Sequence, residues 1–145
     1  MTNWMRTALV GFIAGALGVL IFHQAGFWIA NELGYARASL YNMRPVPPWG
    51  VPTIISQAFW AGLWGIAAAC LVPRLPRPWS GVLGWILFAG IVVTLVNWLV
   101  VLPIKNGQFR MPGMPILVVL PLVYALWGFG MWLIAKLTRN VLGWR

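Results

Sequence analysis

Charged residues are confined to short segments of the chain, and four long windows between them carry no charge. These windows are Thr7–Asn31, Pro45–Pro73, Pro78–Ile104 and Met111–Ala135. Each is longer than the ~20 residues that an α-helix needs to cross a hydrocarbon core roughly 30 Å thick. The pattern predicts an all-α membrane protein, a bundle of four transmembrane helices in one integral membrane domain over residues 1–145. The predicted helices cover about residues 7–29, 51–72, 79–102 and 115–135.

The composition fits this interpretation. The chain is 61% hydrophobic and 8% charged, whereas a soluble protein has roughly one quarter charged residues. The net charge is +9, but the cations are spread over every connection, and nucleic-acid binding requires them to be clustered. We therefore expect the lipid bilayer, and no nucleic acid, as a partner. Lys and Arg beside lipid headgroups are attracted to anionic lipids.

Prolines shape two of the connections. The segment from Pro45 to Pro52 holds four of them, and because proline fixes φ we expect an extended, polyproline-type backbone there. Pro52 suits the first turn of the second helix, where its missing N–H costs nothing. The connection Pro73–Pro78 is very short, which predicts an antiparallel hairpin of the second and third helices.

The cations also predict an orientation. In a four-helix path, six of them fall on the side of the termini: Arg6, Arg74, Arg77, Lys136, Arg139 and Arg145. Four fall on the opposite side: Arg37, Arg44, Lys105 and Arg110. The positive-inside rule then places both termini in the cytoplasm. We expect Trp4, Trp79 and Trp144 at the inner interface, and Trp28 and Trp49 at the outer one.

Small residues mark packing faces on the first two helices. Gly11 and Gly15 form a small-x-x-x-small pair, which lets helix backbones approach closely in a membrane. In the second helix, Gln57, Ala61 and Gly65 follow at i, i+4 and i+8 and share one face. We expect a close helix contact at the glycines of the first helix, and the small-residue face of the second helix supports an inward-facing Gln57.

Three strongly polar residues lie at similar depth in the windows. At about 1.5 Å per residue, His23 lies roughly 9–10 Å inside the end of the first helix, and Gln57 and Asn97 lie at comparable depth. Such groups face the bundle interior, so we expect an inward-pointing, hydrogen-bonded network that Tyr124 can reach. His23 lies about a quarter turn from the glycine face, and Gln24 points the opposite way.

This polar layer has two interpretations. It can be structural, with hydrogen bonds that fix helix register, or it can be a binding site in which His23 ligates a haem or pigment or hydrogen-bonds a small solute. Four deep tryptophans are either packing residues or the lining of a pigment or quinone site: Trp60, Trp64, Trp85 and Trp127.

Catalytic and metal-binding devices are not predicted. The chain has one His, one Cys and one acidic residue, which cannot form an all-protein zinc or di-iron site. Glu32 is the sole carboxylate, so mechanisms with paired acids are excluded. We expect no enzyme activity, and the identity of any cofactor stays open.

Three motifs carry a family resemblance. They are Phe22-His23-Gln24, Pro45-Val46-Pro47-Pro48-Trp49-Gly50-Val51-Pro52 and Phe59-Trp60-x-Gly62-Leu63-Trp64-Gly65. With them the chain resembles an uncharacterised group of small four-helix inner-membrane proteins of proteobacteria. The resemblance implies the fold and a multi-pass location in the bacterial inner (plasma) membrane, and it implies no activity.

Three functions follow as hypotheses. The first is an accessory or structural subunit of a larger membrane complex, with other membrane subunits or a second copy as partners. The second is a small-solute or proton transporter or channel that uses His23, Gln57 and Asn97. The third is a haem- or pigment-binding subunit with His23 as a ligand.

Overall fold

The computed structural model describes residues 2–143 and is mostly helical. Within this part of the chain, four long helices are apolar enough to cross a membrane: Asn3–Glu32, Thr53–Arg74, Val82–Asn106 and Ile116–Val141. We refer to them as the first to the fourth helix. Their positions agree with the four charge-free windows. Trp144 and Arg145, which we assigned to the inner side, lie outside the described residues.

Three of the long helices combine several elements. The first contains α1 (Asn3–Gly18), a π-helical turn η1 (Val19–His23) and α2 (Gln24–Glu32). The second contains α3 (Thr53–Leu71) and a 3₁₀ turn η2 (Val72–Arg74). The third contains α4 (Val82–Leu87), η3 (Phe88–Val93), α5 (Thr94–Val96), η4 (Asn97–Val101) and α6 (Leu102–Asn106), with π-helical turns at η3 and η4. The fourth is α7 (Ile116–Val141).

Several helix ends differ from the predicted ones: the first helix covers Asn3–Glu32 rather than about residues 7–29, and the third ends at Asn106 rather than at about residue 102. The fourth helix runs to Val141 rather than to about residue 135, because Lys136 and Arg139 are good helix formers and suit the negative end of the helix dipole. The third helix begins at Val82 rather than at about residue 79. Ahead of it the chain forms turns, in which the Trp79 N–H donates to the Pro76 carbonyl at 2.9 Å.

The proline-rich segment is a short β-hairpin, which corrects the prediction of a continuous extended backbone. Strands β1 (Pro45–Val46) and β2 (Val51–Pro52) pair antiparallel, with Val46 opposite Val51. Gly50 closes the turn with φ +67°, and its N–H donates to the Val46 carbonyl at 3.0 Å. A positive φ is readily adopted by glycine, so the chain can reverse there. Pro52 precedes the second helix instead of lying in its first turn.

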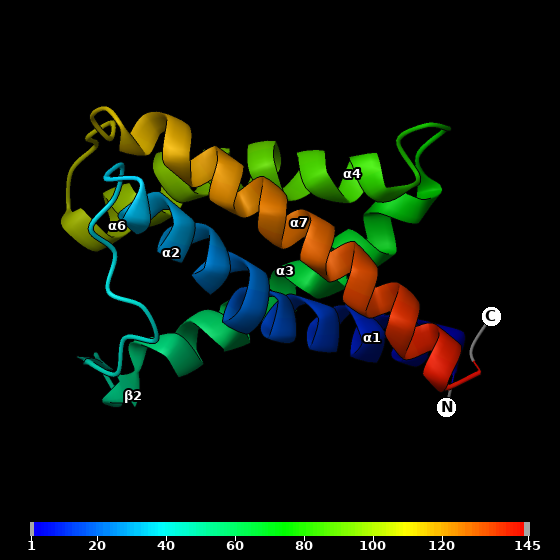
Figure 1. Cartoon of the computed structure of the whole chain (residues 1–145). Coiled ribbons are helices and arrows are strands. Elements are labelled where there is room, and N and C mark those ends of the chain that lie inside the picture. Colours follow the sequence, from blue (N-terminus) through cyan, green and yellow to red (C-terminus); the bar gives the residue numbers. More distant parts are fainter. Residues whose placement is uncertain (1, 144–145) are drawn as a thin grey trace.

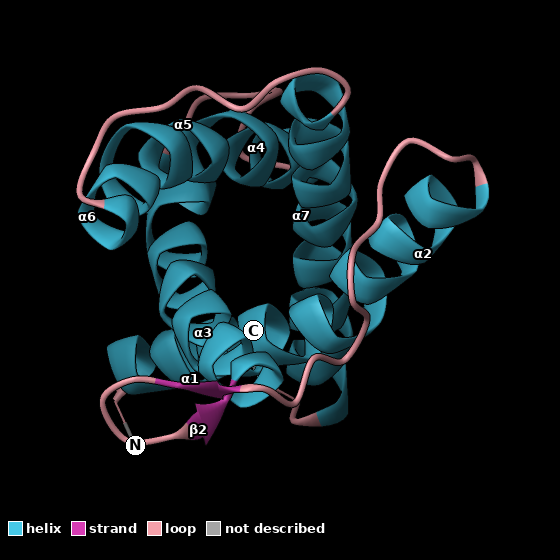
Figure 2. Ribbon diagram, turned by 90° about the vertical axis from the view of Figure 1, so that its left-hand side faces the viewer, coloured by secondary structure: helices cyan, strands magenta, loops and turns pink. Residues whose placement is uncertain are grey.

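The first helix is the centre of the packing. α3 packs along α1, and α7 packs on α1 and also on α4 and η3. Figure 2 shows α3 and α7 on opposite sides of the bundle, with α1 between them at one edge and the third helix at the other. The second and third helices follow each other in the chain, but their extensive contacts are with α1 and α7 respectively.

The predicted glycine face is confirmed. A Cβ on Gly15 would overlap the Ala61 carbonyl, and one on Gly11 would lie 2.6 Å from the Gly65 carbonyl oxygen. The backbones of α1 and α3 thus meet directly at the two small-residue pairs. Gly128 of α7 plays the same part toward the third helix, because a Cβ there would overlap the carbonyl of Trp85.

The two ends of the bundle carry different connections (Figure 1). α1 begins and α7 ends at one end, where the connection 75–81 also lies, and we call this the termini end. The connections 33–52 and 107–115 lie at the opposite end, which we call the loop end.

Candidate functional site

A cleft of about 470 Å³ lies between the second and third helices. Thr53 and Lys105 line it at the loop end, and Trp64 and Trp127 line its deep end. At ~1.5 Å per residue, the lining of α3 from Thr53 to Trp64 is about 16 Å long. The cleft therefore runs from the loop end to about the middle of the second helix.

The structure brings all four predicted site residues to this cleft: His23, Gln57, Asn97 and Tyr124. They come from four different elements, η1, α3, η4 and α7. The predicted hydrogen-bonded network is wrong, however, because within residues 2–143 no hydrogen bond joins any two of these side chains. The residues share a space instead, and none of their side chains has a hydrogen-bond partner among the described residues.

His23 is the most buried of the four, with 7% of its surface exposed. Its ring packs edge-on against Phe27 at 5.0 Å between centroids and lies 5.6 Å from the ring of Tyr124. The Nδ1 atom is buried and has no hydrogen-bond partner. Leaving such a group unpaired costs about 1–3 kcal/mol, and most buried polar side-chain atoms in proteins have a partner. The imidazole thus lines the cleft as a residue, while its Nδ1 atom itself is enclosed by the protein.

Two of the polar residues lie on π-helical turns. His23 closes η1, and Asn97 opens η4. A π-helical turn changes the i→i−4 ladder to i→i−5, which alters the directions of the side chains that follow, and such turns are frequent at functional sites. This local geometry lets His23 face the cleft although simple helical spacing separates it from the glycine face.

Aromatic side chains close the deep end of the cleft. Trp64 of α3 meets Phe88 of η3 edge-on, with 6.0 Å between ring centroids. The Trp127 Nε1–H donates to the Gly15 carbonyl at 3.1 Å in the buried core. Of the four deep tryptophans, Trp60, Trp64 and Trp127 line the cleft. Trp85 is a buried core residue with 3% of its surface exposed.

Among residues 2–143, the one charged side chain that lines the cleft is a cation. Lys105 lies at the loop end of the cleft, and among the described residues no Asp or Glu lines it. The side chains that can donate hydrogen bonds are the amides of Gln57 and Asn97, the hydroxyl of Tyr124, the imidazole and this ammonium group. The surroundings thus favour a ligand that offers acceptor atoms.

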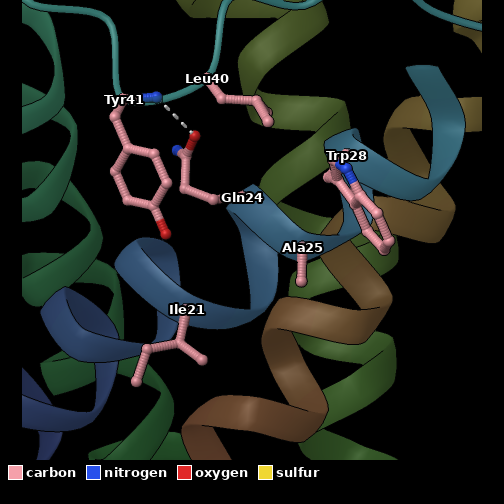
Figure 3. A pocket seen from close by; sticks show the side chains of 6 residues that line it. All are labelled: Ile21, Gln24, Ala25, Trp28, Leu40 and Tyr41. Carbon is pink, nitrogen blue, oxygen red and sulfur yellow. Dashed lines mark hydrogen bonds between the residues drawn. The ribbon is translucent and has the colours of Figure 1, made fainter. Parts of the chain in front are cut away.

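A loop segment packs on the opposite face of the first helix, and this contact was not predicted from the sequence. The Gln24 Oε1 accepts a hydrogen bond from the Tyr41 N–H at 3.0 Å, and the Tyr41 hydroxyl donates to the Leu20 carbonyl at 2.9 Å. Figure 3 shows these side chains around a groove of about 310 Å³ that Trp28 and Leu40 also line.

A second tie fixes the same segment. The Asn31 side chain exchanges two hydrogen bonds with the backbone of Ala38, at 2.8 and 2.9 Å. We call residues 33–44 the strap. The available signal was two amide side chains, Gln24 and Asn31, in the second half of a mostly apolar helix.

Comparisons with known proteins add no relative: no protein-family profile, curated protein or solved structure matches the chain. The resemblance to small proteobacterial membrane proteins therefore stays a prediction. Within residues 2–143, no group of three or more His, Cys, Asp or Glu side chains could hold a metal ion.

Proposed function

We propose that the protein is a membrane-embedded binding protein that holds a small, lipid-soluble molecule with a polar end in the cleft between the second and third helices. The observation that carries this proposal is that His23, Gln57, Asn97 and Tyr124, whose side chains have no hydrogen-bond partner among the described residues, all line one space of about 470 Å³. Ligand sites are typically concave spaces of roughly 300–1,000 Å³, mostly apolar, with a few polar groups that orient the ligand.

The packing supports entry from the bilayer. The second and third helices have their extensive contacts with α1 and α7, so the cleft between them is not closed by a helix–helix interface. In a membrane, lipid chains or a ligand would fill such a space. A molecule that also pairs with His23, Gln57 or Asn97 is preferred, because each hydrogen bond inside a membrane contributes roughly 0.6–2 kcal/mol.

Our proposed location is the inner membrane of a bacterium, with the termini end in the cytoplasm. The second and third helices then cross the bilayer in opposite directions, as their short connection predicts. Support comes from the cations at the termini end, since Arg6, Arg74, Lys136 and Arg139 lie near the helix ends there and Arg77 lies in the connection 75–81, and the positive-inside rule favours that end. The cleft would open in the outer leaflet.

The test is to identify what the protein retains. The wild type and the variants His23→Leu and Val101→Trp are purified in mild detergent from the same cells, and bound small molecules are extracted and quantified by mass spectrometry. Val101 lines the cleft, so a tryptophan there would fill it. We expect a retained molecule in the wild type and at least a tenfold loss in both variants.

Gln108→Leu is the matched control, because Gln108 is exposed and lies outside the cleft. It should retain the molecule as the wild type does. Equal retention by wild type, His23→Leu and Val101→Trp would contradict the proposal.

The shape and lining of the cleft also bear on the other three hypotheses, which are transport, haem or pigment ligation and an accessory role. Transport requires a continuous path, whereas the lining ends at Trp64, Val93 and Trp127 near the middle of the bundle. Haem or pigment ligation has the unpaired imidazole in its favour, and an absorption spectrum of protein from its native membrane tests it: a visible band would support ligation, and its absence would exclude it. An accessory role is compatible with binding, since a protein that only holds a molecule needs another protein to use it.

A further inference from the structure

The two walls of the cleft each present a side-chain amide. Gln57 comes from α3 and Asn97 from η4, and no hydrogen bond joins them. An amide carries two N–H donors and one carbonyl acceptor. Two unpaired amides on facing walls can therefore both donate to an acceptor atom that lies between them.

A second set of donors lies at the back of the cleft. The His23 imidazole and the Tyr124 hydroxyl line it there, with their rings 5.6 Å apart. The ligand would thus meet donors at two separate places, one between the walls and one at the back. With no carboxylate in the lining among residues 2–143, a cationic ligand has no partner for its charge.

Aromatic side chains line the same cleft beside these donors. Trp60 and Trp64 line the α3 side, and Trp127 lines the side of α7. Aromatic faces favour stacked or edge-on contact with another flat ring. Toward the loop end, Val46, Val101 and Ile104 supply an apolar surface.

We propose, building on the function proposed above, that the ligand is a quinone: a flat ring with two carbonyl oxygens on opposite edges and an apolar tail. One carbonyl accepts hydrogen bonds from Gln57 and Asn97, and the other accepts from His23 or Tyr124. The ring lies against the indoles of the cleft. The tail leaves between the second and third helices into the bilayer.

The experiment compares two ligands that differ only in the carbonyl oxygens. Nanodiscs of synthetic phosphatidylcholine, with and without the protein, are equilibrated with a short-tailed quinone or with an analogue that carries hydrogen in place of both carbonyl oxygens. The bound excess is measured by mass spectrometry. We expect the quinone to bind about tenfold more tightly than the analogue, which corresponds to about 1.4 kcal/mol.

Variants test whether the preference for the quinone over the analogue depends on the amides of Gln57 and Asn97. In Gln57→Leu/Asn97→Leu, the quinone should lose its advantage over the analogue, to less than twofold, while Gln108→Leu keeps the full tenfold preference. Gln57→Glu preserves the shape but replaces a donor with an acceptor, so it should weaken quinone binding without affecting the analogue. A normal circular dichroism spectrum and gel-filtration profile show that each variant is folded.

The outcomes separate the two proposals. If quinone and analogue bind equally and Val101→Trp abolishes both, the cleft is a binding site and the quinone assignment is wrong. If neither ligand binds saturably, the quinone assignment is wrong, and the extraction experiment above then decides the binding function on its own. If the double variant keeps the tenfold preference, the two amides do not recognise the carbonyl and the assignment fails.

Discussion

The helix α3 meets its two neighbours in opposite ways. Toward α1 it presents Ala61 and Gly65, and the two backbones touch. Toward the third helix it presents Gln57, Trp60 and Trp64, and a cleft separates the helices. In the proposed bilayer location, lipid gives helices no hydrophobic reason to associate, so close packing has to supply the attraction. Small residues permit that packing on one side of α3, and large polar and aromatic residues hold a space open on the other.

We call the face of α3 that packs against α1 the closed side, and the face that lines the cleft the open side. Adding one methyl group to the closed side should have the largest effect on stability. In Gly15→Ala the new Cβ would overlap the Ala61 carbonyl, which belongs to the backbone and has little room to move. Overpacking of this kind costs about 1–3 kcal/mol, and we expect a loss near 3 kcal/mol in the free energy of unfolding. Unfolding by SDS in mixed micelles, followed by circular dichroism, measures it.

The matched control is Gly113→Ala, because a Cβ on Gly113 meets nothing within 4 Å. It should change the unfolding free energy by less than ~0.5 kcal/mol. If both alanine variants lose the same stability, the backbone contact between α1 and α3 does not hold the bundle together.

The next largest loss of stability should follow from removing the hydrogen bond between the Trp127 indole, which lines the cleft, and the Gly15 carbonyl at the contact of α1 with α3. Trp127 lines the cleft and donates to the Gly15 carbonyl at 3.1 Å. Trp127→Phe removes this donor, and we expect a loss of about 1–2 kcal/mol in the free energy of unfolding. Trp49→Phe, at a position that is 86% exposed, should lose almost none, and the same SDS titration compares them. Equal losses would mean that the indole bond contributes nothing.

The closed side could be predicted from the sequence, and the open side only in part. The spacing of Gly11 and Gly15 is local and lies at one face of a regular helix, so helical geometry was enough to find it. The sharing of one space by His23, Gln57 and Asn97 followed from depth alone. Their lack of mutual hydrogen bonds did not follow, since depth says nothing about the distance between two helices.

The π-helical turns and the strap could not be predicted for a related reason. The window around η1 is apolar apart from His23 and Gln24, and its hydropathy carries no signal for an altered turn. A carbonyl in this turn has a partner far away in the sequence: the Tyr41 hydroxyl donates to the Leu20 carbonyl within η1. Such a contact depends on how the strap folds back, which no pattern within the helix records.

Loosening the strap should have a smaller effect than either change in the core. Tyr41→Phe removes only the hydroxyl that bonds the Leu20 carbonyl, which contributes about 0.5–1.5 kcal/mol. We expect faster amide hydrogen exchange in residues 33–44 and a loss of about 1 kcal/mol or less in the free energy of unfolding. Tyr35→Phe is the matched control, since Tyr35 is 56% exposed and its hydroxyl has no bond within the described residues. Unchanged exchange in Tyr41→Phe would show that the Gln24 and Asn31 bonds hold the strap unaided.

The smallest effect on stability should come from the residue at the back of the cleft. His23→Leu removes a buried imidazole whose Nδ1 has no partner, so the cost of leaving that group unpaired disappears together with any loss of packing. We expect the free energy of unfolding to change by no more than ~0.5 kcal/mol, or to rise. Retention of the bound molecule should nevertheless fall about tenfold, the equivalent of about 1.4 kcal/mol. This is the reverse of Gly15→Ala, and both variants can be followed by the same SDS titration and extraction. A loss of more than 2 kcal/mol in His23→Leu, with retention unchanged once folded protein is isolated, would make His23 a packing residue like those on the closed side.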